Sequence, residues 1–455
     1  MRSVCSLLLA SSVVLAAPPI PPAAKWAPPV VQVRTLASGA KLWVLPQKGV
    51  PLVHVGVLIN AGSLADPADK PGLAMLTATC VEEAGSGAHS GAEVRAFFDS
   101  MGTSLHVDVA ADGVSLQFTA LSTRLESALG QVIEVLGKPR FDASEVAAVK
   151  QRRRSEVVSA LDSPVMFGNA KLLAEVFGAN PRNHLELGTV EGVEASSAED
   201  LKQFHAAHWS PGNTTFVLVG DVDADSAKAM LDRVAPKAWL PPSAKVTASV
   251  PAGAPGKWLA FDKADAAQTV VLFGKPGPAA TDAVRTPLEL ASTLLGGSFT
   301  SRLVQNLREK HGYTYGAHAG LNPGRETMLL VVYTSVKTEV TAPALTELLA
   351  ELVGITRLEP AELEKARSLL DAHQLEDFAS GESAVDALLG DALEDLGPGE
   401  MAAARARREK VTMAELLAAA GKYDPETFTV VLVGDRKKLE KELKATFPAR
   451  TIEWH

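Results

Sequence analysis

An arginine and a tyrosine that could act on a peptide, Arg308 and Tyr315, stand seven residues apart in the stretch Arg-Glu-Lys-His-Gly-Tyr-Thr-Tyr. A fixed guanidinium and a phenol can donate hydrogen bonds to a developing oxyanion or hold a peptide backbone. The same residues also fit a structural role, in which Arg308 caps the C-terminus of a helix and Tyr315 packs on a strand. On the residue types alone, the structural role is favoured.

Metal-ligand chemistry is suggested at two other places. His205 and His208 have the i, i+3 spacing of half a metal site, but they precede Trp209-Ser-Pro211 in a helical stretch, and a structural role is favoured. No spacing rule supports the second group as a metal site. It comprises Cys80, Glu82, Glu83 and His89, with Glu156 as a further ligand.

Other catalytic motifs are missing from the sequence. No Gly-x-Ser-x-Gly nucleophile elbow occurs. The stretch Leu295-Gly-Gly-Ser-Phe-Thr-Ser301 has glycines but neither a lysine nor a dinucleotide pattern, so it does not predict a phosphate-binding loop. We expect it to let a helix approach a sheet closely, or to form a loop that faces a peptide.

The composition predicts a packed globular protein. The chain has 455 residues, of which 47% are hydrophobic and 21% charged, and its net charge of −9 disfavours nucleic acid as a partner. Only two cysteines, Cys5 and Cys80, are present, which excludes a disulfide scaffold and a multi-cysteine zinc site. No stretch reaches the roughly 20 apolar residues of a transmembrane helix. The basic run Lys150–Arg154 is interpreted as a solvated helix face.

The N-terminus predicts export. Arg2 precedes the apolar run from Val4 to Leu15, and small residues follow, as in a signal peptide of residues 1–16. Residues 17–30 are rich in proline and predict an extended spacer. A second break rich in proline and glycine, residues 237–256, separates an N-terminal domain (31–236) from a C-terminal domain (257–455). We therefore expect a periplasmic or extracellular protein.

The two domains read as copies of one another. Pro211–Asp221 (PGNTTFVLVGD) recurs as Pro425–Asp435 (PETFTVVLVGD), and in both a helical stretch precedes the segment while Gly-Asp ends the strand. The same proline, threonine, glycine and aspartate at one spacing are hard to obtain by chance. The sequence therefore predicts a duplication.

The alternation of apolar and polar residues gives the same order of elements in each half. Hairpins of strands cluster while helices come in runs, which favours α+β halves, each a mostly antiparallel sheet with helices on one face. Each half is expected to start with β-rich stretches, at 31–44 and 51–61 and at 257–273. Strand pairs are expected at 103–110 with 113–120 and at 314–321 with 328–333, and helices at 72–82, 92–100, 125–136, 144–161, 287–295, 299–310, 340–352 and 360–379.

The helix that begins at Gly72 carries the most informative pattern. An apolar strand ending in Asn60-Ala-Gly-Ser63, an acidic turn at Asp66 and then Gly72-Leu-Ala resemble the insulinase/pitrilysin metallopeptidases (inverzincins), and especially the branch that includes mitochondrial processing peptidase. In that family the helix carries H-x-x-E-H, in which two histidines bind zinc and the glutamate acts as general base. The corresponding positions here are Met75, Ala78 and Thr79, and none of them can perform that role.

The resemblance also assigns the remaining site residues. The third zinc ligand of the family lies 77 positions beyond the second histidine, which is Glu156 here, and a single carboxylate does not hold zinc. Arg308 and Tyr315 match a pair that reaches the substrate in relatives. The resemblance therefore implies a clamshell of two halves and no zinc in this chain. It also implies a subunit that positions an extended peptide for a zinc-bearing partner in a heterodimer.

Two alternatives remain open. The chain could be a stand-alone peptide-binding or scaffold protein, for example a homodimer that binds extended segments by adding a strand to a sheet edge. It could also be an autonomous peptidase whose metal site is rebuilt around Glu156, which the residues favour least.

Overall fold

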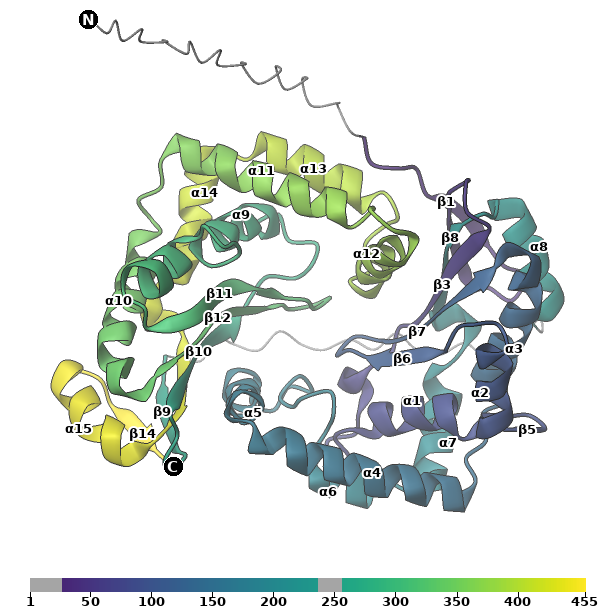
Figure 1. Ribbon diagram of the computed structural model, residues 1–455, viewed down its shortest axis with the longest axis horizontal. Coiled ribbons are helices and arrows are strands. Elements are labelled where there is room, and N and C mark those ends of the chain that lie inside the picture. Colours follow the sequence, from purple (N-terminus) through teal and green to yellow (C-terminus); the bar gives the residue numbers. More distant parts are fainter. Residues whose placement is uncertain (1–26, 236–255) are drawn as a thin grey trace, which may run out of the picture.

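The computed structural model describes residues 27–235 and 256–455, which form two halves, each with a six-stranded sheet (Figure 1). The expected signal peptide, most of the spacer and almost all of the linker lie outside the described residues. Both sheets carry long helices, so the α+β class and the two similar halves are confirmed. No helix within the described ranges is long and apolar enough to span a bilayer.

The first sheet has the strand order β1-β2-β8-β3-β7-β6. All neighbours are antiparallel except β2 and β8. A small hairpin, β4 with β5, follows the first long helix. The strands are β1 (Gln32–Thr35), β2 (Lys41–Pro46), β3 (Leu52–Ile59), β4 (Gly85–Ser86), β5 (His89–Ser90), β6 (His106–Val109), β7 (Val114–Leu121) and β8 (Thr214–Gly220).

The second sheet repeats this order as β14-β9-β13-β10-β12-β11. β13 contains the repeated sequence and occupies the place of β8, parallel to β9 and antiparallel to β10. Only the far edge differs, since β1 is antiparallel to its neighbour and β14 is parallel. The strands are β9 (Trp258–Asp262), β10 (Gln268–Pro276), β11 (Thr314–Asn322), β12 (Leu329–Lys337), β13 (Thr429–Gly434) and β14 (Ile452–Trp454).

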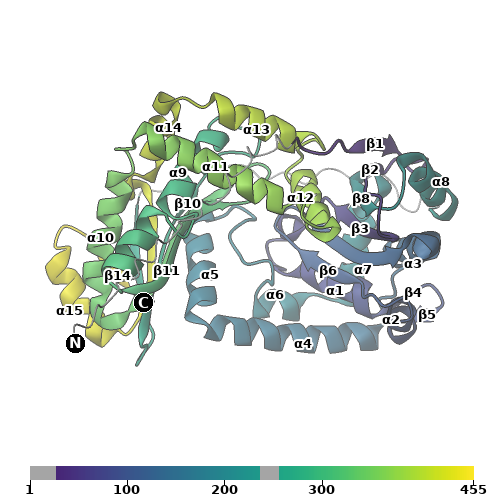
Figure 2. The same ribbon diagram turned by 45° about the horizontal axis from the view of Figure 1, so that its top comes forward.

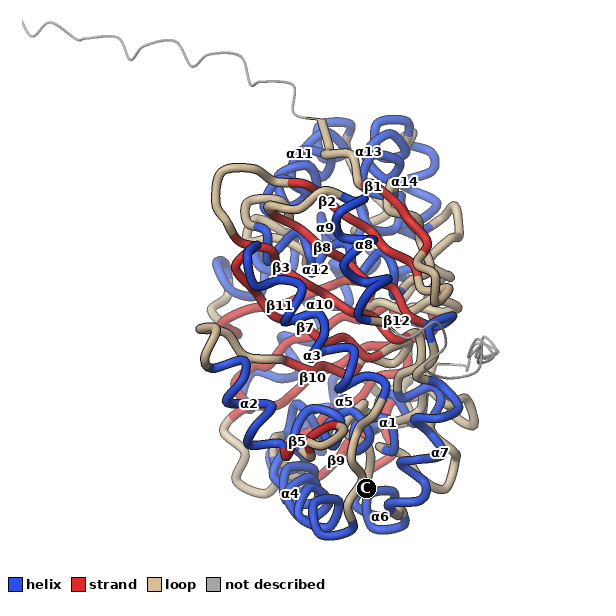
Figure 3. The backbone as a smooth tube through the Cα atoms, turned by 90° about the vertical axis from the view of Figure 1, so that its right-hand side faces the viewer, coloured by secondary structure: helices blue, strands red, loops and turns tan. Residues whose placement is uncertain are grey.

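Most helices of each half cover one face of that half's own sheet, as Figure 3 shows for α3 and α8 in front of the first sheet. Their apolar faces and the sheets form the two main cores. The helices of the first half are α1 (Leu73–Glu83), α2 (Gly91–Asp99), α3 (Leu125–Gly137), α4 (Ala143–Asp162), α5 (Pro164–Phe177), α6 (Val190–Ala195), α7 (Ala198–His208) and α8 (Ala224–Val234). Those of the second are α9 (Arg285–Leu295), a π-helical turn (Val304–Lys310), α10 (Thr341–Gly354), α11 (Pro360–Glu376), α12 (Gly381–Leu393), α13 (Glu400–Lys410), α14 (Met413–Ala420) and α15 (Arg436–Thr446).

Two helices are exchanged between the halves. α5 of the first half packs on β10 and β13 of the second, and α12 of the second half packs on β3 and β8 of the first (Figures 1 and 2). One face of each sheet is therefore covered by helices of its own half, and one helix of the opposite half packs on the other face. The exchange joins the halves through two apolar cores, which the sequence analysis did not predict.

Glycines in the central strands allow these close crossings. A Cβ at Gly56 of β3 would lie 2.7 Å from the side chains of Val385 and Leu389 in α12. A Cβ at Gly274 of β10 would lie 2.7 Å from Leu172 in α5. A larger residue at either place would push the exchanged helix away from the sheet.

Candidate functional site

The helix that resembles the zinc-binding helix of the family is α1, and it is deeply buried. Asp66 fixes its start, because one carboxylate oxygen accepts from the N–H of Gly72 at 2.6 Å and the other from the N–H of Ala74 at 2.7 Å. Ala78 and Thr79 are almost fully buried and Met75 is partly buried. The residues at the three motif positions therefore serve the packing of α1 against its neighbours.

A guanidinium connects two of the positions that bind zinc in the family. Arg153 of α4 donates from Nε and Nη2 to the hydroxyl of Thr79, at 3.1 and 2.7 Å. Its Nη1 donates to the carboxylate of Glu156 at 2.7 Å. The positions of the second and third ligands are thus held by a cationic side chain. The Lys150–Arg154 run is not simply a solvated face, since Arg153 is directed at α1.

The neighbouring arginine extends this network. Arg152 pairs with Glu83 of α1 and lies 3.9 Å from the carboxylate of Glu156. Glu82, one residue earlier on α1, is partly buried, and its burial raises the pKa of its carboxyl group to about 7, with the charge of Glu83 adding to the effect. The nearby backbone N–H of Val107 in β6 opposes that shift. Glu82 therefore lies where α1 packs beside the edge strand of the first sheet.

The residues present do not fit a zinc ion. Burial raises the pKa of the Cys80 thiol to about 12, so it stays protonated, and His89 lies exposed in the β4–β5 hairpin. In the parts of the chain that the structure describes, no three His, Cys, Asp or Glu side chains gather as a metal site would require. Glu156 is engaged by two arginines, and in the described part of the chain it does not gather with Cys80, Glu82, Glu83 and His89 into the rebuilt site, the alternative that the residues favoured least.

The histidine pair of α7 serves packing. The ring of His205 is buried, its Nε2 lies 2.8 Å from the carbonyl oxygen of Leu136, and burial lowers its pKa to about 4. Burial also lowers the pKa of His208, whose ring lies 4.7 Å from that of Phe204. Both imidazoles are therefore neutral parts of the protein interior near pH 7.

Arg308 and Tyr315 lie on adjacent elements of the second half. Arg308 lies in the last turn of the π-helical segment, where its guanidinium stacks 4.6 Å from the centre of the Phe299 ring and lies 3.5 Å from the carboxylate of Glu309. Tyr315 stands near the start of β11 and is 84% exposed. Among the described residues, no hydrogen bond joins the two. The pair is accessible to a ligand, and the tyrosine is not the packed strand residue of the structural interpretation.

The glycine stretch before Phe299 brings α9 against β11. A Cβ at Gly296 would lie 2.2 Å from the backbone nitrogen of Ala319, so only glycine fits. This is the close approach that the sequence analysis expected. Phe299 is 62% exposed, and the guanidinium of Arg308 stacks on its ring at the surface beside β11.

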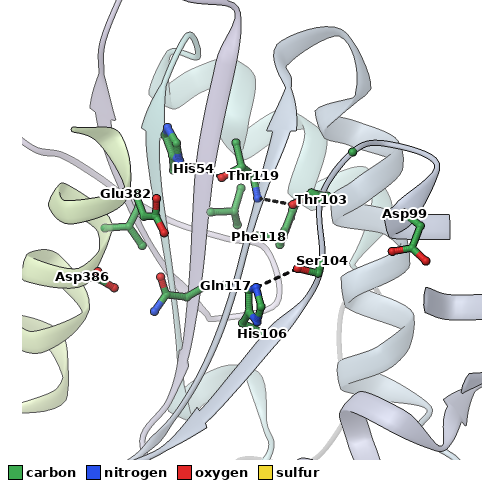
Figure 4. Close-up of a pocket in the computed structure, with 13 residues that line it drawn as sticks. His54, Asp99, Thr103, Ser104, His106, Gln117, Phe118, Thr119, Glu382 and Asp386 are labelled. Carbon is green, nitrogen blue, oxygen red and sulfur yellow. Dashed lines mark hydrogen bonds between the residues drawn. The ribbon is translucent and has the colours of Figure 1, made fainter. Parts of the chain in front are cut away.

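A cavity of about 780 Å³ opens between the first sheet and the start of α12 (Figure 4). Glu382 and Asp386 of α12 face His54, Gln117 and Thr119 of the sheet across it. Among the residues that the structure describes, neither lysine nor arginine lines this cavity. Burial lowers the pKa of His54, against the opposing charge of Glu382, and its Nδ1 lies 2.9 Å from the hydroxyl of Thr119. Near pH 7 the cavity is therefore acidic.

A second cavity, of about 570 Å³, occupies the equivalent place in the other half. It is lined by β10, β11, β12 and the start of α5, as the first is lined by β3, β7, the β6 region and the start of α12. Its side chains are mainly aromatic or small, among them Tyr315, His318 and Tyr333. The duplication has thus produced two related cavities with different chemistry.

Sequence reasoning missed Arg153, Glu382 and His54. Arg153 lies one turn from Glu156, and this spacing was a usable signal once Glu156 had been singled out. His54 and Glu382 are 328 positions apart and meet only because α12 crosses to the first sheet. No local pattern could have indicated that meeting.

Comparisons with known proteins agree with this architecture. The family model for insulinase (peptidase family M16) matches residues 43–184, and the model for the peptidase M16 inactive domain matches residues 196–370. The chain is 26% identical over 306 residues to an uncharacterized zinc protease of Mycobacterium leprae (strain TN), covering 66% of this chain and 68% of that protein. It is 23% identical over 316 residues to the non-peptidase homolog YmxG of Helicobacter pylori, covering 68% and 72%.

Solved structures share the fold. A peptidase M16 inactive domain from Pseudomonas fluorescens superposes with a TM-score of 0.81 at 23% identity, covering 89% of this chain and 98% of that one. A chain of Complex III2 from Candida albicans superposes with a TM-score of 0.74 at 13% identity, covering 90% and 97%. The two matched ranges together span more than half of the sequence. The protein therefore belongs to the insulinase family, peptidase family M16.

Proposed function

We propose that this M16 homologue is an exported, non-catalytic subunit that binds an extended peptide and positions it for a zinc-bearing partner. The proposal is carried by one observation, the exposure of Tyr315. A phenol that is 84% exposed on a strand and makes no described hydrogen bond contributes little to packing, while Arg308 stands beside the same surface. The Tyr315 hydroxyl and the guanidinium donors of Arg308 that do not face Glu309 can donate to a peptide carbonyl.

The state of α1 supports the non-catalytic part of the proposal. A zincin-type reaction needs a metal-bound water and a general base. Ala78 stands at the place of the base, and the hydroxyl of Thr79 already receives the guanidinium of Arg153. A zinc ion, if it takes part, would have to be brought by another chain.

The edge strands suggest how the peptide binds. β6 and β11 end their sheets, and each pairs with only one strand in the described part of the structure. We place the peptide on β11, because Tyr315 and the cavity that it lines with His318 lie on that edge strand. Side chains of a peptide on β11 would alternate toward and away from the cavity that contains Tyr315 and His318.

A peptide-cleavage assay with a zinc-bearing M16 partner tests the proposal. We expect the mixture to cleave peptide faster than the partner alone, and Arg308→Ala with Tyr315→Phe to remove most of that gain. The matched control is Arg436→Ala, which removes an arginine paired with Glu440 on α15. Unchanged activity in the double variant would remove these two residues from the proposed role.

A second candidate is a peptide-binding scaffold that acts without a peptidase. It is favoured by the two cavities and the free edge of β11, which need no metal to bind peptide. Co-purification separates the candidates, because a homodimer or monomer without a zinc-bearing chain supports the scaffold. The proposed export is checked by sequencing the N-terminus of the mature protein, which we expect to begin after Ala16.

A further inference from the structure

The contact between Arg153 and Thr79 uses the whole hydrogen-bonding capacity of the hydroxyl. Thr79 Oγ1 donates to the carbonyl of Met75 at 2.8 Å, which aims its lone pairs at Arg153, and it accepts there from Nε and Nη2. Thr79 is 2% exposed. The hydroxyl therefore has no lone pair left for a metal ion or for water.

The same guanidinium joins two helices. Thr79 belongs to α1, whereas Arg153 and Glu156 belong to α4, and Arg153 binds both residues. A metal ion held by the corresponding positions would also cross-link α1 to α4. The planar fork of arginine suits this task because its donors point in fixed directions, which a lysine cannot reproduce.

An exposed ion pair on the same helix, made by the next arginine, can be compared with the contacts of Arg153. Arg154 pairs with Glu194 at 2.7 Å, and both side chains are more than half exposed. The Arg153 side chain is 24% exposed, and its hydroxyl partner is buried. Arg153 thus makes a contact at the helix interface, while Arg154 makes one at the surface.

We propose that Arg153 is a built-in cation that replaces the metal of this fold. It cross-links α1 and α4 through Thr79 and Glu156, and it keeps zinc out of this chain even when zinc ligands are supplied. The inference goes beyond the proposed function, because it concerns the isolated chain and requires neither peptide nor partner.

Restoring the zinc-binding residues of the family tests directly whether Arg153 keeps zinc out of this chain. The variant Met75→His/Ala78→Glu/Thr79→His restores the family pattern, and a second variant adds Arg153→Ala. Zinc affinity is measured at pH 7 by competition with a chromophoric chelator, after circular dichroism has shown that both variants are folded. We expect the variant without Arg153 to bind zinc at least about tenfold more tightly, since Glu156 is then released to the metal.

A matched control isolates the position of the charge. Adding Arg154→Ala to the rebuilt variant removes the same charge one residue away and should leave zinc affinity unchanged. Equal zinc affinity with and without Arg153, including failure of both to bind, contradicts the proposal. So does an equal gain from Arg154→Ala, which would reflect net charge alone.

Thermal unfolding of the otherwise unaltered protein tests the cross-link without metal. Arg153→Met should lower the unfolding midpoint by about 2 °C or more, and Arg153→Lys should recover little of the loss because lysine lacks the fork. Arg154→Met should shift the midpoint much less. Equal midpoints for the two methionine variants would show that Arg153 does not hold the helices together.

Discussion

Leu172 of α5 lies directly over Gly274 of β10, so that a Cβ on the glycine would come within 2.7 Å of the leucine side chain. The first residue belongs to the first half of the duplicated chain and the second to the other half. The contact is repeated between α12 and Gly56 of β3. The two halves are therefore joined by packed cores as well as by the linker segment between them.

This relationship predicts that Leu172→Ala destabilises the whole molecule. The leucine is fully buried against the second sheet, and its truncation should cost about 2–5 kcal/mol of the free energy of unfolding. Urea denaturation followed by circular dichroism measures the change. Leu375→Ala is the control, since Leu375 is half exposed on α11 and should change little. Equal effects from both substitutions would contradict the packing role of α5.

A second prediction concerns the hydroxyl of Thr79. Thr79→Val keeps the shape of the side chain but leaves two donors of Arg153 without their acceptor, which should cost about 1–3 kcal/mol. Thr77→Val is a close control, because the Thr77 hydroxyl lies on the same helix and also donates to a carbonyl four residues earlier. The expected result is a larger loss for Thr79→Val in chemical denaturation. A loss no larger than that of Thr77→Val would argue against the Arg153 contact.

The pH dependence of stability gives a third prediction. Burial, with the charges of Glu400 and Glu394, raises the pKa of the Asp391 carboxyl in α12 to about 7. Between about pH 4 and pH 7 the folded protein then binds more protons at Asp391 than the unfolded chain, so this residue lowers stability as pH rises. Asp391→Asn should therefore stabilise the protein more at pH 8 than at pH 5. Thermal unfolding at both pH values checks this, and an equal shift at both would be evidence against it.

A fourth prediction follows from Glu82 and the edge of the first sheet. The Glu82 carboxylate lies near the amide of Val107, so Glu82→Ala should leave that amide more open to solvent. Hydrogen exchange of the Val107 amide, measured by NMR or mass spectrometry, should become faster. The amide of Ala110, which donates to the carbonyl of Gly113, serves as the internal reference and should not change. Unchanged exchange at Val107 would contradict the contact.

Much of the fold could be predicted because its signals are local. The repeated Pro-to-Asp segment predicted that β8 and β13 occupy equivalent places, and both are buried strands beside a parallel neighbour. The alternation of apolar residues placed β3 and β7, and the helical spacing placed α1 and α4 within two residues of their observed ends. Binary patterning suffices when an element packs on its own half.

The exchanged helices and the acidic cavity could not be predicted in this way. The apolar face of α12 has the same spacing whether the helix packs on its own sheet or on the other one. The periodicity of apolar residues therefore does not indicate which sheet the helix contacts. The loss of zinc ligands could be read from Met75, Ala78 and Thr79, because it depends on residue types. The role of Arg153 was missed despite its spacing from Glu156, because a run of basic residues on a helix is more often solvated.

The most direct test of the account is the zinc content of the purified protein, alone and with any chain that co-purifies with it. The chain is isolated from its native source under mild conditions, and zinc is determined by elemental analysis of each resolved component. The account predicts no stoichiometric zinc in the isolated chain and one zinc per complex, carried by a partner with H-x-x-E-H. One zinc bound by the isolated chain, with peptide cleavage that a chelator abolishes, would contradict it.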